Sequence, residues 1–528
     1  MVAVVDPKGL SADVEPTTLN EIWIEAKNNP FTVVVCLFLA LGGFAHGYDN
    51  GVIGGATVMQ HFRTTMGWPQ DAAQATPEST NQLMWIVTSF AIGATVSAFF
   101  GGQYADKYGR RIGFGTGALL FTIGGAVQCF GSSYIEMVIG RVIAGVAVGF
   151  LSCISPMYSS EVSTPMMRGV LTSFYQIYIC VAIVIASLLN IALNNIAIGW
   201  RISLGVQVIL GGIMTIGVLF MPESPKWLLR KNRKSDCIHA LFRLRGCPNK
   251  VNDELLLLES EIEKEVEETG GGAQLSWAQM FSISRVRNTV IIGVLIQFFQ
   301  IMTGVNAIMF YVPDMLAVIG IDALSSALAA NCIFLLGVVV ELFIVDLVGR
   351  RKLLLWGMNM QVVTLVTGGV IALGFHNDLA HQPVAEGLVV VCICLFLGAF
   401  GVGYGPGAWC YCSEMFSPMA RGKGIGITTS ANWGTSIITS VVTPHMYTSS
   451  WGTGGTLVFF GIISAVAVPF TYFMIPETKG VHLEGMTVLF NIKEYGGWAK
   501  FMRANASGKQ PASAKLVKTV VCERPTEL

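Results

Sequence analysis

The sequence predicts an all-α transmembrane protein of twelve helices, arranged as two pseudo-symmetric six-helix bundles joined by a polar linker. Of its 528 residues, 53% are hydrophobic and only 12% are charged, and the mean hydropathy is +0.60. A soluble protein would carry about 25% charged residues, so the shortage indicates lipid as the solvent over most of the surface. Apolar stretches of about 20 residues, long enough to span a bilayer as a helix, occur about twelve times.

The hydropathy also predicts the order of the elements. We expect transmembrane helices near 31–58, 82–104, 112–131, 135–157, 169–193, 201–221, 288–313, 324–346, 353–374, 387–412, 422–447 and 455–475. The corresponding regions are an N-terminal segment (1–30), a first bundle (31–224), a linker (225–287), a second bundle (288–480) and a C-terminal tail (481–528). The apolar spacing within the linker predicts short amphipathic helices.

Basic residues predict the orientation in the membrane. They gather in GRR at 109–111, between predicted helices two and three, and in GRRK at 349–352, between helices eight and nine. In the loop at 59–81, on the other side of the membrane, Arg63 is the only lysine or arginine. The positive-inside rule therefore places both termini and the linker in the cytosol.

Three motifs recur in the same order, each at a predicted cytosolic helix end. They are DKYGRR (106–111) with DLVGRR (346–351), SEVSTPMMRG (160–169) with SEMFSPMARG (413–422), and PESPK (222–226) with PETKG (476–480). Ordered pairs of this kind indicate a duplicated six-helix unit. Parallel repeats about an axis normal to the membrane occur in secondary transporters, with the substrate site between the halves.

The repeated charges predict a gating network at the cytosolic helix ends. Carboxylates and guanidinium groups can latch two halves together in one conformation and release them in another. The alternative is that the arginines only follow the positive-inside rule. That alternative does not explain why each Glu recurs seven residues before its Arg. The predicted network comprises Asp106, Arg110, Glu161, Arg168, Asp346, Arg350, Glu414 and Arg421.

These motifs resemble those of the sugar porter family of the major facilitator superfamily, over residues 30 to 485 approximately. The family signatures occur as GGQYADKYGRR (101–111), GRVIAGVAVGF (140–150), PMYSSEVSTPMMRG (156–169), PESPKWLL (222–229), QIMTGVNAIMFY (300–311) and PETKG (476–480). The resemblance implies the major facilitator fold, in which two six-helix halves rock around a central monosaccharide site.

The resemblance also implies five sugar-binding residues. They are a helix-five glutamine, two polar residues of helix seven, a helix-ten tryptophan and a helix-eleven asparagine: Gln176, Gln300, Asn306, Trp409 and Asn432. Amides donate and accept hydrogen bonds, and an aromatic face covers the C–H surface of a sugar. Taken singly, each amide could instead join neighbouring helices.

Three positions depart from the family pattern. Ile301 replaces a second helix-seven glutamine, Phe334 stands where helix eight usually carries an asparagine, and Gly401 replaces an acidic residue of helix ten. Asn331 lies about one turn before Phe334. The substrate can therefore be glucose, another hexose, a pentose or a polyol.

Asp49, in GYDNGVIGG at 47–55, is the only formally charged residue between Phe31 and Met59. A charge at the bilayer centre costs about 2.5–3.5 kcal/mol, so it needs a partner or a purpose. The predicted topology puts Arg141 of helix four at a similar depth. The pair is either a permanent structural ion pair or a proton carrier, because a nearby cation favours the carboxylate and an apolar cavity favours the acid.

The resemblance favours the proton carrier, since proton-coupled sugar porters have Asp in this motif. His46, one turn before Asp49, stands where the family usually has an apolar residue. It either tunes the acid or is an interior histidine with satisfied hydrogen bonds.

The resemblance thus implies proton-coupled symport of a monosaccharide, a hexose such as glucose, by alternating access. A facilitative sugar or polyol uniporter and a non-transporting sugar sensor are the alternatives. The expected partners are sugar, proton and membrane lipid, without nucleic acid, cofactor or metal, and the transport unit is a monomer in the plasma membrane. We do not expect an enzyme, because HExxH, GxSxG and phosphate-loop motifs are missing from the sequence.

Overall fold

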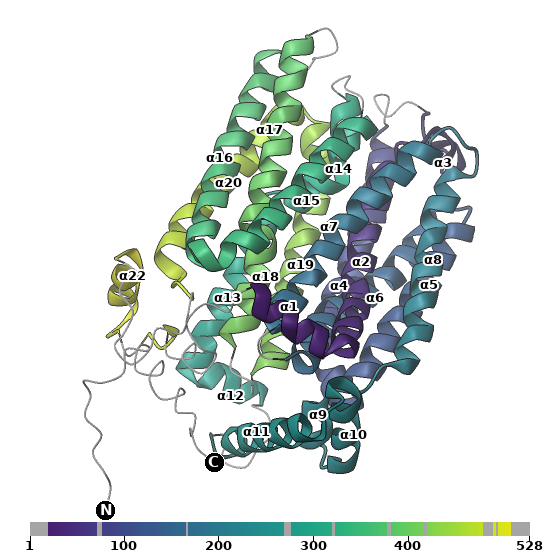
Figure 1. The fold of residues 1–528 in the computed structure, drawn as a ribbon. Coiled ribbons are helices and arrows are strands. Elements are labelled where there is room, and N and C mark those ends of the chain that lie inside the picture. The colour runs from purple at the N-terminus through teal and green to yellow at the C-terminus, as the bar shows by residue number, and fades with distance from the viewer. Residues whose placement is uncertain are drawn as a thin grey trace, which may run out of the picture.

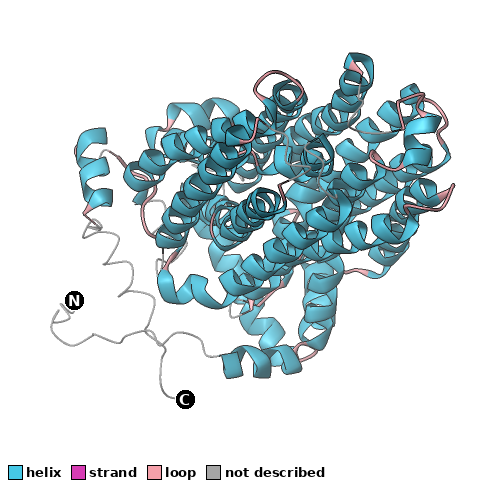
Figure 2. Cartoon of the chain, turned by 90° about the horizontal axis from the view of Figure 1, so that it is seen from above, coloured by secondary structure: helices cyan, strands magenta, loops and turns pink. Residues whose placement is uncertain are grey.

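The computed structural model describes residues 19–70, 76–164, 167–268, 276–318, 323–376, 382–416, 420–478, 489–492 and 495–507. Over these ranges the chain forms helices joined by short loops, and no strand occurs (Figure 2). The all-α prediction is therefore confirmed.

The helices run in the following order: α1 Leu19–Asn28, α2 Pro30–Ala56, α3 Gln60–Thr65, α4 Pro77–Tyr108, α5 Arg110–Phe130, α6 Tyr134–Val162, α7 Arg168–Leu193, α8 Gly199–Gly217 with a 3-10 turn Val218–Phe220, α9 Pro225–Arg230, α10 Lys234–Arg245, α11 Pro248–Glu268, α12 Trp277–Ser282, α13 Ser284–Met302, α14 Val305–Val318, α15 Ala323–Val348, α16 Arg350–Gly374, α17 Pro383–Val402, α18 Tyr404–Met415, α19 Arg421–Tyr447, α20 Gly452–Met474 and α22 Trp498–Ala506.

Helices occupy all twelve predicted transmembrane positions. Within the described residues, eleven segments are long and apolar enough to cross a membrane. The twelfth, α19, is not among these eleven; its sequence is rich in Thr, Ser and Gly. It nevertheless packs along α4 and α13 inside the bundle. Twelve segments in two halves agree with the predicted architecture.

Predicted helices seven and ten are each broken in the structure. Gly304, at φ +89°, separates α13 from α14, and Gly403 separates α17 from α18. Hydropathy did not indicate these breaks, because the sequence is apolar on both sides of each glycine. Each break exposes backbone groups in the membrane interior, which other parts of the protein must satisfy.

Figure 1 shows the two halves side by side: α2 and α4 to α8 form the first, and α13 to α20 form the second. The linker helices α9 to α12 lie across one end of the bundle, which we call the linker end. Trp227 of α9 donates through Nε1 to the carbonyl oxygen of Asp106 at 2.9 Å, and Arg245 of α10 donates to the Thr32 hydroxyl at 2.9 Å. The linker is thereby docked on the first half.

The halves repeat the same local bonds at the linker end. In the first half, Oε1 of Glu223 accepts the backbone N–H of Arg110 at 2.9 Å. In the second, Oε1 of Glu477 accepts the backbone N–H of Arg350 at 3.0 Å. Both glutamates come from the recurrent PE motifs, and each caps the helix that begins with the recurrent GRR motif. The motif repeat is therefore also a structural repeat.

The opposite end of the bundle is closed by contacts between the halves. Asn331 of α15 donates through Nδ2 to the hydroxyl of Ser187 on α7 at 3.0 Å. Gly54 of α2 lies so close to α14 that an added Cβ would be 2.9 Å from the carbonyl oxygen of Phe310. Between the ends, α4 and α19 run together, and Ser430 donates to the carbonyl oxygen of Thr95 at 3.0 Å.

The GRR glycines allow a direct test of the repeat. Gly109 and Gly349 have φ of +108° and +98°, and a Cβ would lie 2.3 Å from Oε2 of Glu223 or 2.6 Å from Oε2 of Glu477. Gly109→Ala and Gly349→Ala should each destabilise the protein by about 1–3 kcal/mol, lowering its melting temperature in detergent. Gly212→Ala in α8 is the control, because its Cβ would meet nothing within 4 Å. Equal melting temperatures for all three variants would refute this reading of the two caps.

Candidate functional site

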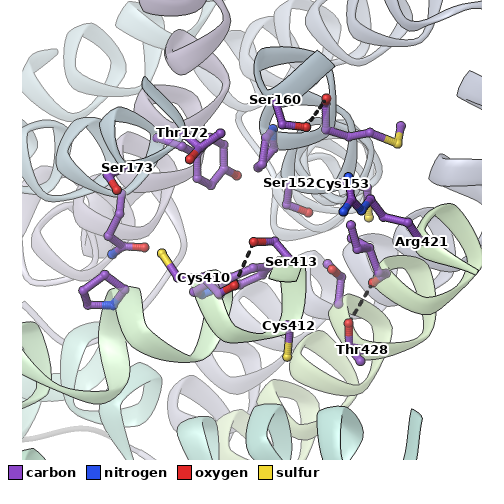
Figure 3. A pocket seen from close by; sticks show the side chains of 18 of the residues that line it. Ser152, Cys153, Ser160, Thr172, Ser173, Cys410, Cys412, Ser413, Arg421 and Thr428 are labelled. Atoms are coloured by element: carbon purple, nitrogen blue, oxygen red, sulfur yellow. Dashed lines mark hydrogen bonds between the residues drawn. The ribbon is translucent and has the colours of Figure 1, made fainter. Parts of the chain in front are cut away.

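A cavity of about 350 Å³ lies between the two halves and reaches the linker end. Figure 3 shows its polar walls: Ser160, Thr172 and Ser173 belong to the first half and Cys410 and Ser413 to the second. At its mouth are Arg168, Arg350 and Arg421, each the first residue of its helix. This volume falls within the range of small-molecule sites.

Two of the predicted sugar-binding residues line this cavity. Gln176 lies on α7 in the first half, and Trp409 lies on α18 in the second. An amide and an indole from opposite halves can contact one ligand together. Such a ligand would bridge the halves.

Two further predicted residues lie behind the cavity wall in an amide cluster. Nδ2 of Asn432 donates to Oε1 of Gln297 at 2.6 Å and to Oε1 of Gln300 at 2.7 Å. Nε2 of Gln300 donates to the carbonyl oxygens of Tyr404 and Gly405 at 2.9 and 3.0 Å. Gln300 thus ties α13 to the first turn of α18, directly after the break at Gly403.

Gln297 lines the cavity, although the sequence analysis did not select it. It is fully buried, and none of the described residues offers an oxygen or nitrogen acceptor to its Nε2. A buried amide N–H with no oxygen or nitrogen acceptor beside a cavity is suited to donate to a ligand hydroxyl. Its spacing from Gln300 was an available signal, because residues three apart share a helix face.

The remaining polar candidates lie elsewhere. Asn306 donates to the hydroxyl of Ser436 on α19 at 3.0 Å and does not line the cavity. Asn331 belongs to the closed end, as described above. Phe334 is buried, and an added Cβ on Gly401 would lie 2.7 Å from its carbonyl oxygen. The absence of a side chain at Gly401 thus lets α17 pack closely on α15.

Asp49 and Arg141 form an ion pair inside the first half, at the similar depth that the topology predicted. Nη1 of Arg141 donates to Oδ2 of Asp49 at 2.5 Å, and both side chains are completely buried. The other carboxylate oxygen accepts from Nε2 of Gln207 at 3.1 Å, and Nε of Arg141 donates to the carbonyl oxygen of Ile86 at 3.2 Å. The guanidinium carbon lies 4.4 Å from the ring centroid of Phe90.

This environment joins four helices. Asp49 lies on α2, Arg141 on α6, Phe90 on α4 and Gln207 on α8. The pair is therefore a centre of packing for the first half as well as a titratable site.

Three of the predicted gating residues, Asp106, Arg110 and Glu161, contact one another within the first half. Arg110 donates to both oxygens of Glu161 at 2.8 and 2.9 Å and pairs with Asp106 at 2.9 Å. Glu161 thus pairs with Arg110 of its own half, whereas Arg168 lies at the cavity mouth. The side chains of Asp346 and Glu414 lie outside the described set.

The family profile "Sugar (and other) transporter" matches residues 35–490. Sugar transport protein 10 of Arabidopsis thaliana is 30% identical over 494 residues, covering 90% of this chain and 93% of that protein. H(+)/hexose cotransporter 1 of Parachlorella kessleri is 31% identical over 475 residues, covering 87% of this chain and 88% of that protein.

A solved structure supports the fold. The proton:xylose symporter XylE of E. coli, of the major facilitator superfamily, matches in its complex with 6-bromo-6-deoxy-D-glucose with a TM-score of 0.72. The match covers 88% of this chain and 100% of that chain at 24% identity.

The two neighbouring glutamines should differ in their effects on stability. Gln300→Ala removes two hydrogen bonds to the first turn of α18 and one to Asn432, each worth about 0.5–1.5 kcal/mol, so the melting temperature in detergent should fall clearly. Gln297→Ala is the matched control on the same helix, and it should change the melting temperature less, since Asn432 keeps its bond to Gln300. Equal losses would show that Gln300 does not support the broken helix.

Proposed function

This chain belongs to the sugar porter family of the major facilitator superfamily, and from this premise we propose that it is a proton-coupled monosaccharide symporter. The observation that carries the proposal is the buried Asp49–Arg141 pair. An intramembrane acid that faces a single cation can exchange a proton when the distance between them changes. The match to a H(+)/hexose cotransporter supports a hexose as the substrate class.

We propose that the linker end faces the cytosol, because the basic motifs lie there. The cavity then opens inward while the Ser187–Asn331 bond and the α2–α14 contact close the outer end. Alternating access requires a second conformation in which those contacts part. The transport unit is one chain, in the plasma membrane, with both termini cytosolic.

Within the cavity, Gln176, Gln297 and Trp409 are the proposed direct sugar contacts. Gln300 and Asn432 hold Gln297 in place from behind. Asn306 lies close enough in sequence to the break at Gly304 to enter the site if α14 moves. This arrangement gives the sugar hydrogen-bonding groups from both halves.

The proton step uses Asp49 alone as the carrier. With the pair closed, Arg141 favours the carboxylate; when the pair separates in the apolar interior, the carboxylate takes a proton from outside water. Reclosing the pair returns that proton to the cytosolic side. One positive charge moving inward gains about 2.3 kcal/mol per 100 mV, which supports about 40-fold sugar accumulation.

The decisive test is uptake of labelled hexoses in cells that lack their own sugar carriers, with and without a protonophore. Wild-type accumulation should collapse with the protonophore. Asp49→Asn should only equilibrate sugar or fail to transport it, because an amide carries no proton. If both forms equilibrate sugar alike and ignore the protonophore, the chain is a facilitator and the ion pair is structural.

Gln297→Ala should raise KM for the transported sugar about two- to tenfold, as expected for one lost hydrogen bond of about 0.5–1.5 kcal/mol. Initial uptake rates against sugar concentration measure this change. Gln103→Ala, on α4 outside the cavity, is the control. An unchanged KM in the Gln297 variant would remove Gln297 from the proposed site.

A further inference from the structure

One side chain of the second half lies inside the core of the first. Trp433 of α19 is 1% exposed and belongs to the apolar core formed mainly by α2, α4, α5 and α6. Its ring meets Phe90 edge-on at 5.5 Å between centroids, and His46 at 5.0 Å. Both partners belong to the first half, on α4 and α2.

The contact continues to the ion pair. The ring of Phe90 contacts both Trp433 and Arg141. The guanidinium carbon of Arg141 lies 4.4 Å from the centroid of the Phe90 ring. Arg141 in turn holds Asp49. A continuous series of buried contacts therefore runs from Trp433 through Phe90 and Arg141 to the carboxylate.

At its other end the series reaches the cavity. Trp433 directly follows Asn432, which holds both Gln297 and Gln300. Neighbouring residues of one helix move together, so a shift of Asn432 also shifts Trp433. A ligand that displaces the Gln297 side chain would therefore also displace Asn432 of α19 and, with it, the Trp433 indole.

His46 provides a second contact between the same regions. It lies on α2 one turn before Asp49, and its Nδ1 is 3.5 Å from the hydroxyl of Tyr175, a residue of the cavity wall. Its imidazole packs on Trp433. The histidine that the sequence analysis singled out thus lies between the cavity wall, the indole and the acid.

We propose that Trp433 and Phe90 are positioning residues that couple occupancy of the sugar cavity to the Asp49–Arg141 pair. Sugar bound at Gln297 shifts α19, Trp433 moves against Phe90, and Phe90 no longer holds the guanidinium group beside Asp49. The inference rests on the proposed function, because it explains how the symporter links its two substrates. Neither aromatic residue needs to touch the sugar.

The test separates coupling from transport in vesicles that contain the purified protein. Sugar counterflow measures exchange without net proton movement, and accumulation under a membrane potential measures coupling. Phe90→Leu should keep counterflow near the wild-type rate, while its accumulation ratio falls from about 40-fold at 100 mV to unity. Phe121→Leu, which removes a buried ring of α5 from the same core, is the matched control and should still accumulate sugar.

A second pair of variants distinguishes a loss of coupling from a folding defect. Trp433→Leu should lose accumulation like Phe90→Leu, and Trp433→Phe, which keeps a ring against Phe90, should recover part of it. Full accumulation in both leucine variants overturns the proposal. Loss of counterflow in both, with Trp433→Phe no better than Trp433→Leu, also overturns it, because the series then only supports the fold. Absence of potential-driven accumulation in the wild type would instead refute the symport proposal itself.

Discussion

The first half is organised around two opposite charges that water does not reach. Taking a carboxylate and a guanidinium group out of water costs several kcal/mol each, and their attraction offsets this only when the remaining hydrogen-bonding groups are also satisfied. Here Gln207 and the Ile86 carbonyl oxygen supply two of those bonds, Phe90 covers the guanidinium face, and Nη2 of Arg141 is left without a hydrogen-bond partner among the described residues. Four helices must therefore meet at one depth, which sets the packing of the whole half.

The proposed proton step depends on the same constraint. A buried carboxylate separated from its cation is far more costly than a neutral acid, so separation and protonation are linked. A conformational change that lengthens the Asp49–Arg141 distance thus brings a proton with it. Coupling needs only a mechanical link between that distance and the occupancy of the cavity.

The two halves share a repeated scaffold but differ in their interiors. Both use a PE glutamate and a GRR glycine to fix the linker end, as Glu223 and Glu477 show. In the interior, the first half holds the ion pair, whereas the second holds the amide cluster of Gln297, Gln300 and Asn432. The two halves thus share the same local structure at the linker end, whereas their interiors hold different polar groups.

The sequence by itself determined the class of the protein. Hydropathy located all twelve segments, the repeated motifs indicated two halves, and an isolated Asp49 pointed to Arg141, because charge in lipid leaves few alternatives. It did not decide which amides face the cavity: Gln297 does, whereas Gln300 instead bonds to the carbonyl oxygens of Tyr404 and Gly405. It also did not decide which arginine Glu161 pairs with, and it did not place Trp433 in the core of the opposite half. These outcomes depend on helix rotation, on breaks at two glycines and on contacts between helices far apart in sequence, and only tertiary packing sets those.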